Sequence, residues 1–332
     1  MKYSLAIDFG SVYTSIYRKD EGLILKEPSL ICARQSGDRY EILACGIEAK
    51  KMQGKTDDKT YIFSPISEGK IKAPEYAAFL LDYFLKKIEK PFVKENAIFC
   101  VSSVLSKKEK QEFVSTFSDC KIKNIALVPS IVCASVMAGV DIGSSKTVFA
   151  MQIGGTVSEV ALINMNRIIK GGALELGGRT LDVEIANIIS DRYSTAISIA
   201  SAQKLKEEIS SLYENDVQSY EVVGFDEESN KPTKIIVSSA EIMPATQKFA
   251  NMLALTLETT INVCPPEILA DIFSNGLYLF GGSSNISGID KYLRKQLNID
   301  VKIVEDNDNA CILGAGKLLS DMASLKEIIA NF

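Results

Sequence analysis

Histidine is absent from this 332-residue sequence, and its absence excludes several classes of enzyme. Histidine is the commonest general base near neutral pH and belongs to the Ser-His-Asp and Cys-His arrangements, so hydrolases that depend on them are excluded. Zinc sites without histidine need clustered cysteines, yet the seven cysteines form no C-x-x-C pair. Their odd number also argues against a disulfide framework, so we expect a reducing, cytoplasmic environment.

Long apolar runs and an excess of basic charge are absent too. No apolar run reaches the ~20 residues that a membrane-spanning helix needs, and the first ten residues already have the pattern of a strand, so we expect no signal peptide. The formal net charge is −5, which gives no overall basic field, so nucleic acid is not an expected partner. The length and the 46% of hydrophobic residues predict a globular protein of two domains.

The most informative stretch is residues 5–17, whose pattern is strand, tight polar turn and strand again. Asp8 stands near the end of the first strand, and Gly10 opens the turn. Glycine lets the backbone approach a ligand closely, successive N–H groups of a turn can bind phosphate, and Asp8 is placed to hold a hydrated Mg²⁺. Taken alone, such a turn is more often a simple hairpin, so the interpretation needs further support.

That support comes from two more glycine-bearing turns. Residues 147–163 repeat the pattern of strand, polar turn and strand, with Gly154 and Gly155 in the turn. A third strand, residues 276–280, leads directly into Gly281-Gly282-Ser283 and then a helix over 289–297. Two hairpins can hold a polyphosphate from opposite sides, and the third turn predicts another edge that faces the ligand.

Between these turns, strands alternate with helices, which predicts an α/β fold with parallel strand pairing. Apolar positions at helical spacing predict a helix over 74–88, one that begins after Ser106, and a long helix over 242–263. A further helix is expected over 202–213. We expect a first lobe over 1–141 with a small inserted subdomain at about 33–65, a second lobe over 142–309 with a small subdomain at about 177–240, and a C-terminal helix at about 310–332 that returns to the first lobe.

The order of the three turns resembles the superfamily of actin, DnaK-type chaperones and sugar kinases. Within it, the chain is most similar to the MreB-like bacterial actins, through motifs spread over its whole length: residues 6–11, 45–52, 69–71, 177–178, 181–182, 239–242, 265–272, 281–283, 288–290 and 313–317. The resemblance implies a two-lobed actin-like fold, in which each lobe has an RNase-H-like core and ATP or ADP binds with Mg²⁺ in the cleft between the lobes.

The resemblance also assigns site residues by matching motifs. Asp8 matches the acid near the metal. The residues matched to the nucleotide are those of the first turn, the second turn, the adenosine-facing helix and the third turn: Gly10, Ser11, Val12, Tyr13, Thr14, Gly154, Gly155, Thr156, Gln203, Lys206, Ser210, Gly281, Gly282 and Ser283.

The chain departs from the family at positions that carry catalysis. Members usually have Asp at the start of the second turn, where this chain has Gln152, and Glu-Glu-Pro before the helix that ends the first lobe, where it has Pro129-Ser130-Ile131. These acids arrange the metal and the attacking water, so we expect ATP hydrolysis to be weak or lost. An alignment shifted by one residue is the alternative, but the ungapped match of residues 158–163 favours the loss.

The function that the resemblance implies is a cytoskeletal filament at the inner face of the membrane that governs cell shape, with copies of the chain and other cell-shape proteins as partners. Phe92 and Val93, which lie among lysines, either touch anionic lipid or begin the next buried strand.

The alternative functions are a DnaK-type chaperone or reactivase, a sugar kinase, and an FtsA- or PilM-like membrane adaptor. The chain has no sign of a peptide-binding domain or of an acid that would activate a sugar hydroxyl.

Overall fold

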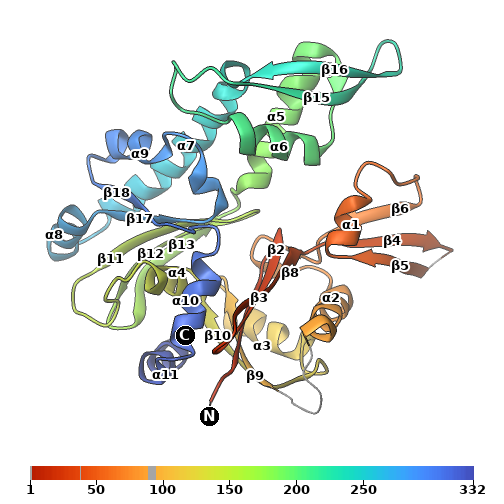
Figure 1. The fold of residues 1–332 in the computed structure, drawn as a ribbon. Coiled ribbons are helices and arrows are strands. Elements are labelled where there is room, and N and C mark those ends of the chain that lie inside the picture. Colours follow the sequence, from red (N-terminus) through yellow and green to blue (C-terminus); the bar gives the residue numbers. More distant parts are fainter. Residues whose placement is uncertain (1, 38, 89–94) are drawn as a thin grey trace.

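The computed structural model describes residues 2–37, 39–88 and 95–332, which form two lobes around two five-stranded sheets (Figure 1). The first sheet has the order β10-β9-β1-β2-β3. Strands β1 to β3 are antiparallel, whereas β9 and β10 run parallel to β1. The bounds are β1 (Leu5–Phe9), β2 (Tyr13–Arg18), β3 (Gly22–Pro28), β9 (Glu95–Val101) and β10 (Ile122–Pro129).

The second sheet repeats this topology in the order β13-β12-β11-β17-β18. Strands β11 to β13 are antiparallel, and β17 and β18 run parallel to β11. Each sheet therefore consists of three consecutive antiparallel strands and two strands added through helical connections, so the parallel pairing predicted from the alternation is present in part of each sheet. The bounds are β11 (Val148–Ile153), β12 (Ser158–Asn164), β13 (Arg167–Leu174), β17 (Leu277–Phe280) and β18 (Val301–Ile303).

Three apolar clusters form the core. One lies within each lobe, and the third contains residues of both sheets, such as Ala6, Ala150 and Ala161, together with helices α4 and α10. These two helices pack against each other between the lobes (Figure 1). Helices of the two lobes include α2 (Pro74–Ile88), α3 (Lys107–Thr116), α4 (Ser130–Met137), α7 (Ser239–Asn262), α8 (Pro266–Asn275), α9 (Ile289–Leu297) and α10 (Ala310–Leu318).

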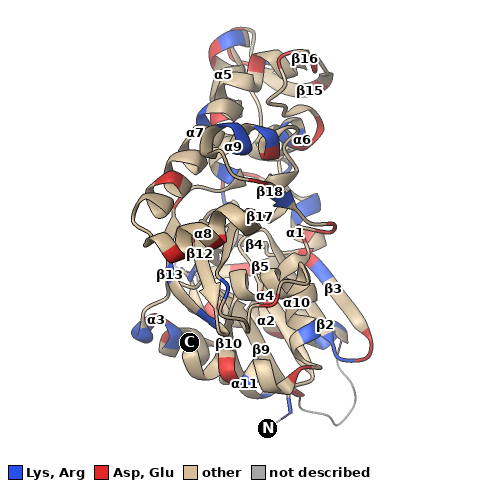
Figure 2. Cartoon of the chain, turned by 90° about the vertical axis from the view of Figure 1, so that its left-hand side faces the viewer, with Lys and Arg blue, Asp and Glu red and all other residues tan. Residues whose placement is uncertain are grey.

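Each lobe carries a small subdomain at a distance from the chain termini (Figure 1). The first contains a three-stranded sheet, a short helix and a two-stranded hairpin: β4 (Ile31–Ser36), β5 (Arg39–Cys45), β6 (Thr60–Phe63), α1 (Ile47–Lys51), β7 (Ile66–Ser67) and β8 (Lys70–Ile71). The second contains β14 (Thr195–Ala196), β15 (Ser219–Asp226), β16 (Lys231–Ser238), α5 (Gly178–Tyr193) and α6 (Ile199–Ile209). Acidic and basic residues are interspersed over the side of the molecule that Figure 2 shows.

Two predicted helices differ from the structure. The helix expected over 202–213 ends at Ile209, because the next residues turn extended and exchange backbone hydrogen bonds with Ser287. The single C-terminal helix expected over about 310–332 is two helices, α10 and α11 (Met322–Asn331). The break occurs at Asp321, whose carboxylate accepts a hydrogen bond from the Ser324 N–H and so begins a new helix.

The structure also bears on the membrane. In the described part of the chain, no helix is both long and apolar enough to cross a bilayer. Phe92 and Val93, predicted to touch lipid, lie outside the described residues.

Candidate functional site

The two predicted hairpin turns have the same geometry. In the first, the Gly10 N–H donates to the Tyr13 carbonyl over 3.1 Å, and in the second the Gly154 N–H donates to the Val157 carbonyl over 2.9 Å. Each turn therefore closes a hairpin with a four-residue connection. The internal repeat expected from the sequence is present in the backbone.

The two turns also touch each other, although they belong to different sheets. The Thr156 hydroxyl donates to the Ser11 hydroxyl over 3.1 Å. A Cβ atom on Gly155 would lie only 2.2 Å from Cγ2 of Val12, so any larger residue at position 155 would push the turns apart. The two turns consequently lie in one place, as a phosphate chain held from two sides requires.

The third turn lies against the strand that leads to the second. Gly281 has φ of +92°, and a Cβ atom there would lie 2.2 Å from the Ile153 carbonyl oxygen. Only glycine fits this conformation and this approach. Ser283, two residues later, lies beside Gly178 at the start of α5, where a Cβ atom would be 2.6 Å from its hydroxyl. The three predicted turns thus converge.

The start of α5 packs on the back of the second turn. The N–H groups of Gly178 and Arg179 donate to the carbonyls of Gly154 and Gly155 over 3.0 and 2.8 Å. A Cβ atom on Gly177 would lie 2.6 Å from the backbone of Gly155. The two glycines at the beginning of α5 therefore support the second turn rather than a ligand.

The predicted adenosine-facing residues have different surroundings. The Lys206 ammonium forms an ion pair of 2.7 Å with Asp182 and donates to the Gly178 carbonyl over 3.0 Å. Burial raises the pKa of Asp182, and Lys206 opposes this effect. Gln203 donates to Glu207 over 2.7 Å on the exposed side of α6. Lys206 is thus held beside the second and third turns, whereas Gln203 is engaged by its own helix.

Ser210 is the C-terminal cap of α6, one helical turn beyond Lys206, and its N–H donates to the Lys206 carbonyl over 3.2 Å. Its side chain is buried, and its hydroxyl has no hydrogen-bond partner among the described residues. Its carbonyl accepts from the Ser287 N–H over 3.3 Å. This contact, which the helical spacing did not predict, brings Ser210 next to the loop that follows the third turn.

Asp8 lies partly buried at the foot of the first turn. Its pKa is raised to about 6, chiefly by burial, while the Cys311 thiol and the charge of Lys26 act in the opposite direction. A carboxylate in this setting gains from a cation that compensates for lost water. Oxygen ligands of this kind suit Mg²⁺, and the residues present therefore fit a hydrated Mg²⁺ beside a phosphate chain.

The two positions expected to have lost catalytic acids, Ser130 and Gln152, differ in how their side chains are engaged. The Ser130 hydroxyl donates to the Val101 carbonyl over 3.0 Å and is buried, so its hydrogen is already used by the backbone. Gln152 occupies the place in β11 that Asp8 occupies in β1, as the strand registers show. Its amide oxygen is buried without a hydrogen-bond partner in the described residues.

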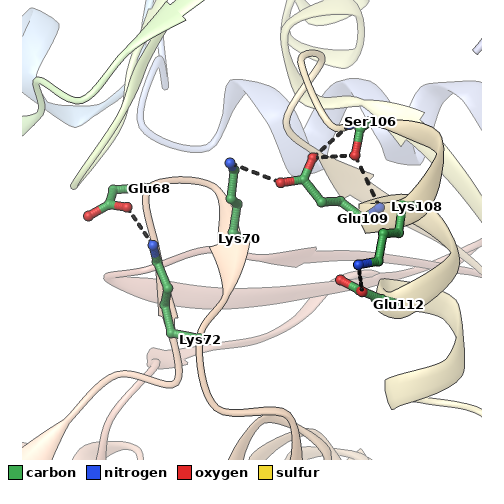
Figure 3. A network of polar contacts seen from close by, with 7 residues as sticks. All are labelled: Glu68, Lys70, Lys72, Ser106, Lys108, Glu109 and Glu112. Carbon is green, nitrogen blue, oxygen red and sulfur yellow. Dashed lines mark hydrogen bonds and ion pairs between the residues drawn. The ribbon is translucent and has the colours of Figure 1, made fainter.

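The β7–β8 hairpin is a part of the site that sequence reasoning missed. The Glu68 N–H donates to the Thr156 hydroxyl over 2.8 Å, so this turn reaches the second hairpin turn from the first lobe. Figure 3 shows how the hairpin is anchored: Lys70 pairs with Glu109 at 2.9 Å, and Glu109 caps α3 through Ser106. The hydrogen bond from Lys70, together with those from the hydroxyl and N–H of Ser106, lowers the pKa of Glu109 to about 2. The motif at residues 69–71 marked the hairpin, but nothing in the sequence indicated its contact with Thr156.

A second missed contact joins the lobes behind the same turn. The Glu159 carboxylate accepts hydrogen bonds from the Ser103 N–H over 2.9 Å and from its hydroxyl over 2.5 Å. Glu159 follows the second turn on β12, and Ser103 follows β9 of the first lobe. The hairpin register could have placed Glu159 opposite Gln152, but no sequence signal pointed to Ser103.

Comparison with known proteins agrees with this arrangement. The model of the MreB/Mbl protein family matches residues 2–327. The cell shape-determining protein MreB of Escherichia coli strain K12 is 28% identical over 321 residues, which cover 95% of this chain and 92% of that protein. The cell shape-determining protein Mbl of Bacillus subtilis strain 168 is 26% identical over 325 residues, which cover 97% of each chain.

Solved structures share the fold. MreB5 of Spiroplasma citri bound to AMPPNP matches with a TM-score of 0.90 and 24% identity over 98% of both chains. A MamK double helical filament matches with a TM-score of 0.79 and 19% identity over 95% of this chain and 98% of that one. These likenesses confirm the predicted two-lobed, actin-like α/β fold. Because the family model matches nearly the whole chain, this protein belongs to the MreB/Mbl family.

Proposed function

We propose that this protein binds ATP or ADP with Mg²⁺ between its lobes and assembles with copies of itself into filaments that contribute to cell shape. The observation that carries the proposal is the convergence of two hairpin turns of matching geometry at the contact between Ser11 and Thr156. Backbone N–H groups from both turns would bind the phosphates, and Asp8 would hold the metal through its water shell. Bound Mg²⁺ would supply positive charge to the phosphate oxygens.

Relatives support the nucleotide and the filament. MreB5 of Spiroplasma citri was solved with AMPPNP and with ADP, and MamK was solved as a double helical filament. We propose residues 1–141 and 142–309 as the two lobes that enclose the nucleotide. The match to the MreB/Mbl model favours this function over a chaperone, a reactivase, a sugar kinase or an FtsA- or PilM-like adaptor.

Hydrolysis is expected to be slow or absent even though the nucleotide binds. In-line attack needs a water that is placed and helped to lose its proton. At the two positions where the family has acids, Gln152 is a neutral amide and Ser130 donates to the backbone. Filament assembly would then respond to nucleotide occupancy rather than to hydrolysis.

We also place the filament at the inner face of the membrane, where other cell-shape proteins would meet it. The relatives MreB and Mbl are cell shape-determining proteins. Phe92 and Val93, among lysines, are the residues proposed to enter lipid. One such pair buries little apolar area, so binding would become firm only when many subunits of a filament act together.

Two measurements on the full chain test the proposal. Isothermal titration with ATP and ADP in Mg²⁺ should show saturable binding, and ultracentrifugation should pellet more protein with nucleotide than without it. Asp8→Ala should weaken binding by removing an acceptor of the metal's water shell. If titration at millimolar ligand shows no binding, the nucleotide function is wrong. If no condition pellets the protein, the filament is wrong.

A further inference from the structure

Each of the two equivalent hairpins carries one carboxylate at the same level, but on opposite strands. In the first hairpin Asp8 on the incoming strand pairs with Ser15. In the second, Gln152 takes the incoming position and pairs with Glu159 on the outgoing strand. Residues directly opposite in an antiparallel pair share a face of the sheet. The acid absent from position 152 therefore has a carboxylate directly across from it.

Glu159 is buried and lacks a cationic partner. Its side chain is only 5% exposed. In the described part of the chain, no lysine or arginine forms an ion pair with it, and both hydrogen bonds from Ser103 end on the same oxygen, Oε2. A buried carboxylate is costly unless hydrogen bonds and an opposite charge compensate it. The contacts with Ser103 supply the hydrogen bonds, but no lysine or arginine among the described residues supplies the opposite charge.

Other oxygen acceptors lie around the same place. The amide oxygen of Gln152 is buried without a hydrogen-bond partner among the described residues. The contact between Ser11 and Thr156 brings the hairpin that carries Asp8 against the hairpin that carries Glu159. Two carboxylates and an unpaired amide oxygen are hard oxygen groups, which are the groups that a hydrated Mg²⁺ selects.

We propose that Glu159 takes over from the missing acid at position 152 and serves as the second carboxylate that holds the water shell of nucleotide-bound Mg²⁺. The inference rests on the proposed nucleotide function and refines it. In this assignment, Asp8 on one hairpin and Glu159 on the other both support metal binding. Activation of the attacking water is a separate task, for which Ser130 offers no acid. Glu159 acts as a positioning residue for the metal, and its contact with Ser103 holds the carboxylate in place.

The test measures the affinity of purified full-length protein for ADP by isothermal titration, once in EDTA and once in Mg²⁺. For the wild type, Mg²⁺ should increase the affinity. Glu159→Gln should leave the affinity in EDTA unchanged and weaken the affinity in Mg²⁺ by about 10-fold or more, the usual effect of losing a residue that orients a metal's ligands. Ser103→Ala, which removes the hydroxyl hydrogen bond but keeps both the backbone N–H hydrogen bond to Glu159 and the carboxylate itself, is the matched control and should retain most of the Mg²⁺ effect.

A swapped variant gives the sharpest result. Gln152→Asp combined with Glu159→Gln returns the acid to the incoming strand and should restore the Mg²⁺ effect that Glu159→Gln removes. Thermal unfolding of each variant without nucleotide shows whether it is folded. The proposal is overturned if Glu159→Gln keeps the full Mg²⁺ effect or if the folded swapped variant fails to regain it. If the wild type binds ADP in neither condition, the nucleotide function itself has failed.

Discussion

Replacing Asp8 by asparagine should stabilise the nucleotide-free protein, and the gain should depend on pH. The pKa of this partly buried carboxyl is raised from its ordinary 3.8 to about 6, chiefly by burial. Such a group favours folding only while it is protonated, so its contribution is complete below pH 3.8 and is lost as the pH rises through about 6. At about 1.4 kcal/mol for each pH unit, the loss reaches about 3 kcal/mol at pH 8. This is an upper limit, because Asp8 keeps some access to water.

Urea unfolding in EDTA measures the effect. Since an amide does not ionise, Asp8→Asn should exceed the wild type in free energy of unfolding by at most about 3 kcal/mol at pH 8 and by at most about 1 kcal/mol at pH 4.5. Asp119→Asn, which removes an exposed carboxylate, is the control and should show little change. Mg²⁺ with ADP should then stabilise the wild type more than the variant. A gain that is equal at every pH, or a loss at pH 8, would refute this account of Asp8.

Three further outcomes are expected. The double substitution Gln152→Asp with Ser130→Glu should raise the rate of phosphate release by ~10-fold or more, because it restores both acids that serve the attacking water. If the wild type already releases phosphate as fast as an MreB with both acids, these positions are misassigned. Phe92→Asp with Val93→Asp should abolish sedimentation with anionic liposomes and leave the circular dichroism spectrum unchanged, whereas equal sedimentation of both proteins would reject the lipid contact. Gly281→Val should weaken nucleotide binding in a titration, since a side chain there displaces the backbone of the third turn; an unaltered affinity would argue against that turn as part of the site.

The fold could be predicted largely from local patterns. The hairpins around Gly10 and Gly154 have a strong signal, because apolar strands flank a short polar turn that contains glycine. The Ser106 cap was predicted correctly, since Ser followed three residues later by Glu is a capping box, and both of its hydrogen bonds are present. These features depend on residues close together in the sequence, where spacing alone fixes the geometry.

What the sequence could not supply are contacts between distant segments. The end of α6 was mispredicted because Ser287, far along the chain, takes the backbone groups of residues 210–212. Likewise, Glu159 and Ser103 meet only because the two lobes bring β12 and β9 together. Apolar periodicity indicates which face of an element is buried but not which partner it packs against, so the contacts between the lobes could be identified only from the structure.

The arrangement explains why nucleotide binding and hydrolysis can separate in this fold. The proposed binding surface is mainly backbone, and its shape depends on glycines such as Gly155 and Gly281, where a single Cβ atom would lie 2.2 Å from a neighbouring atom. In the proposed assignment, hydrolysis would depend instead on the side chains at positions 130 and 152, which lie outside the three glycine-bearing turns. At position 130, for example, the serine hydroxyl donates to the Val101 carbonyl at the end of β9. A chain can therefore lose the acids that activate water and keep the cradle that holds the phosphates.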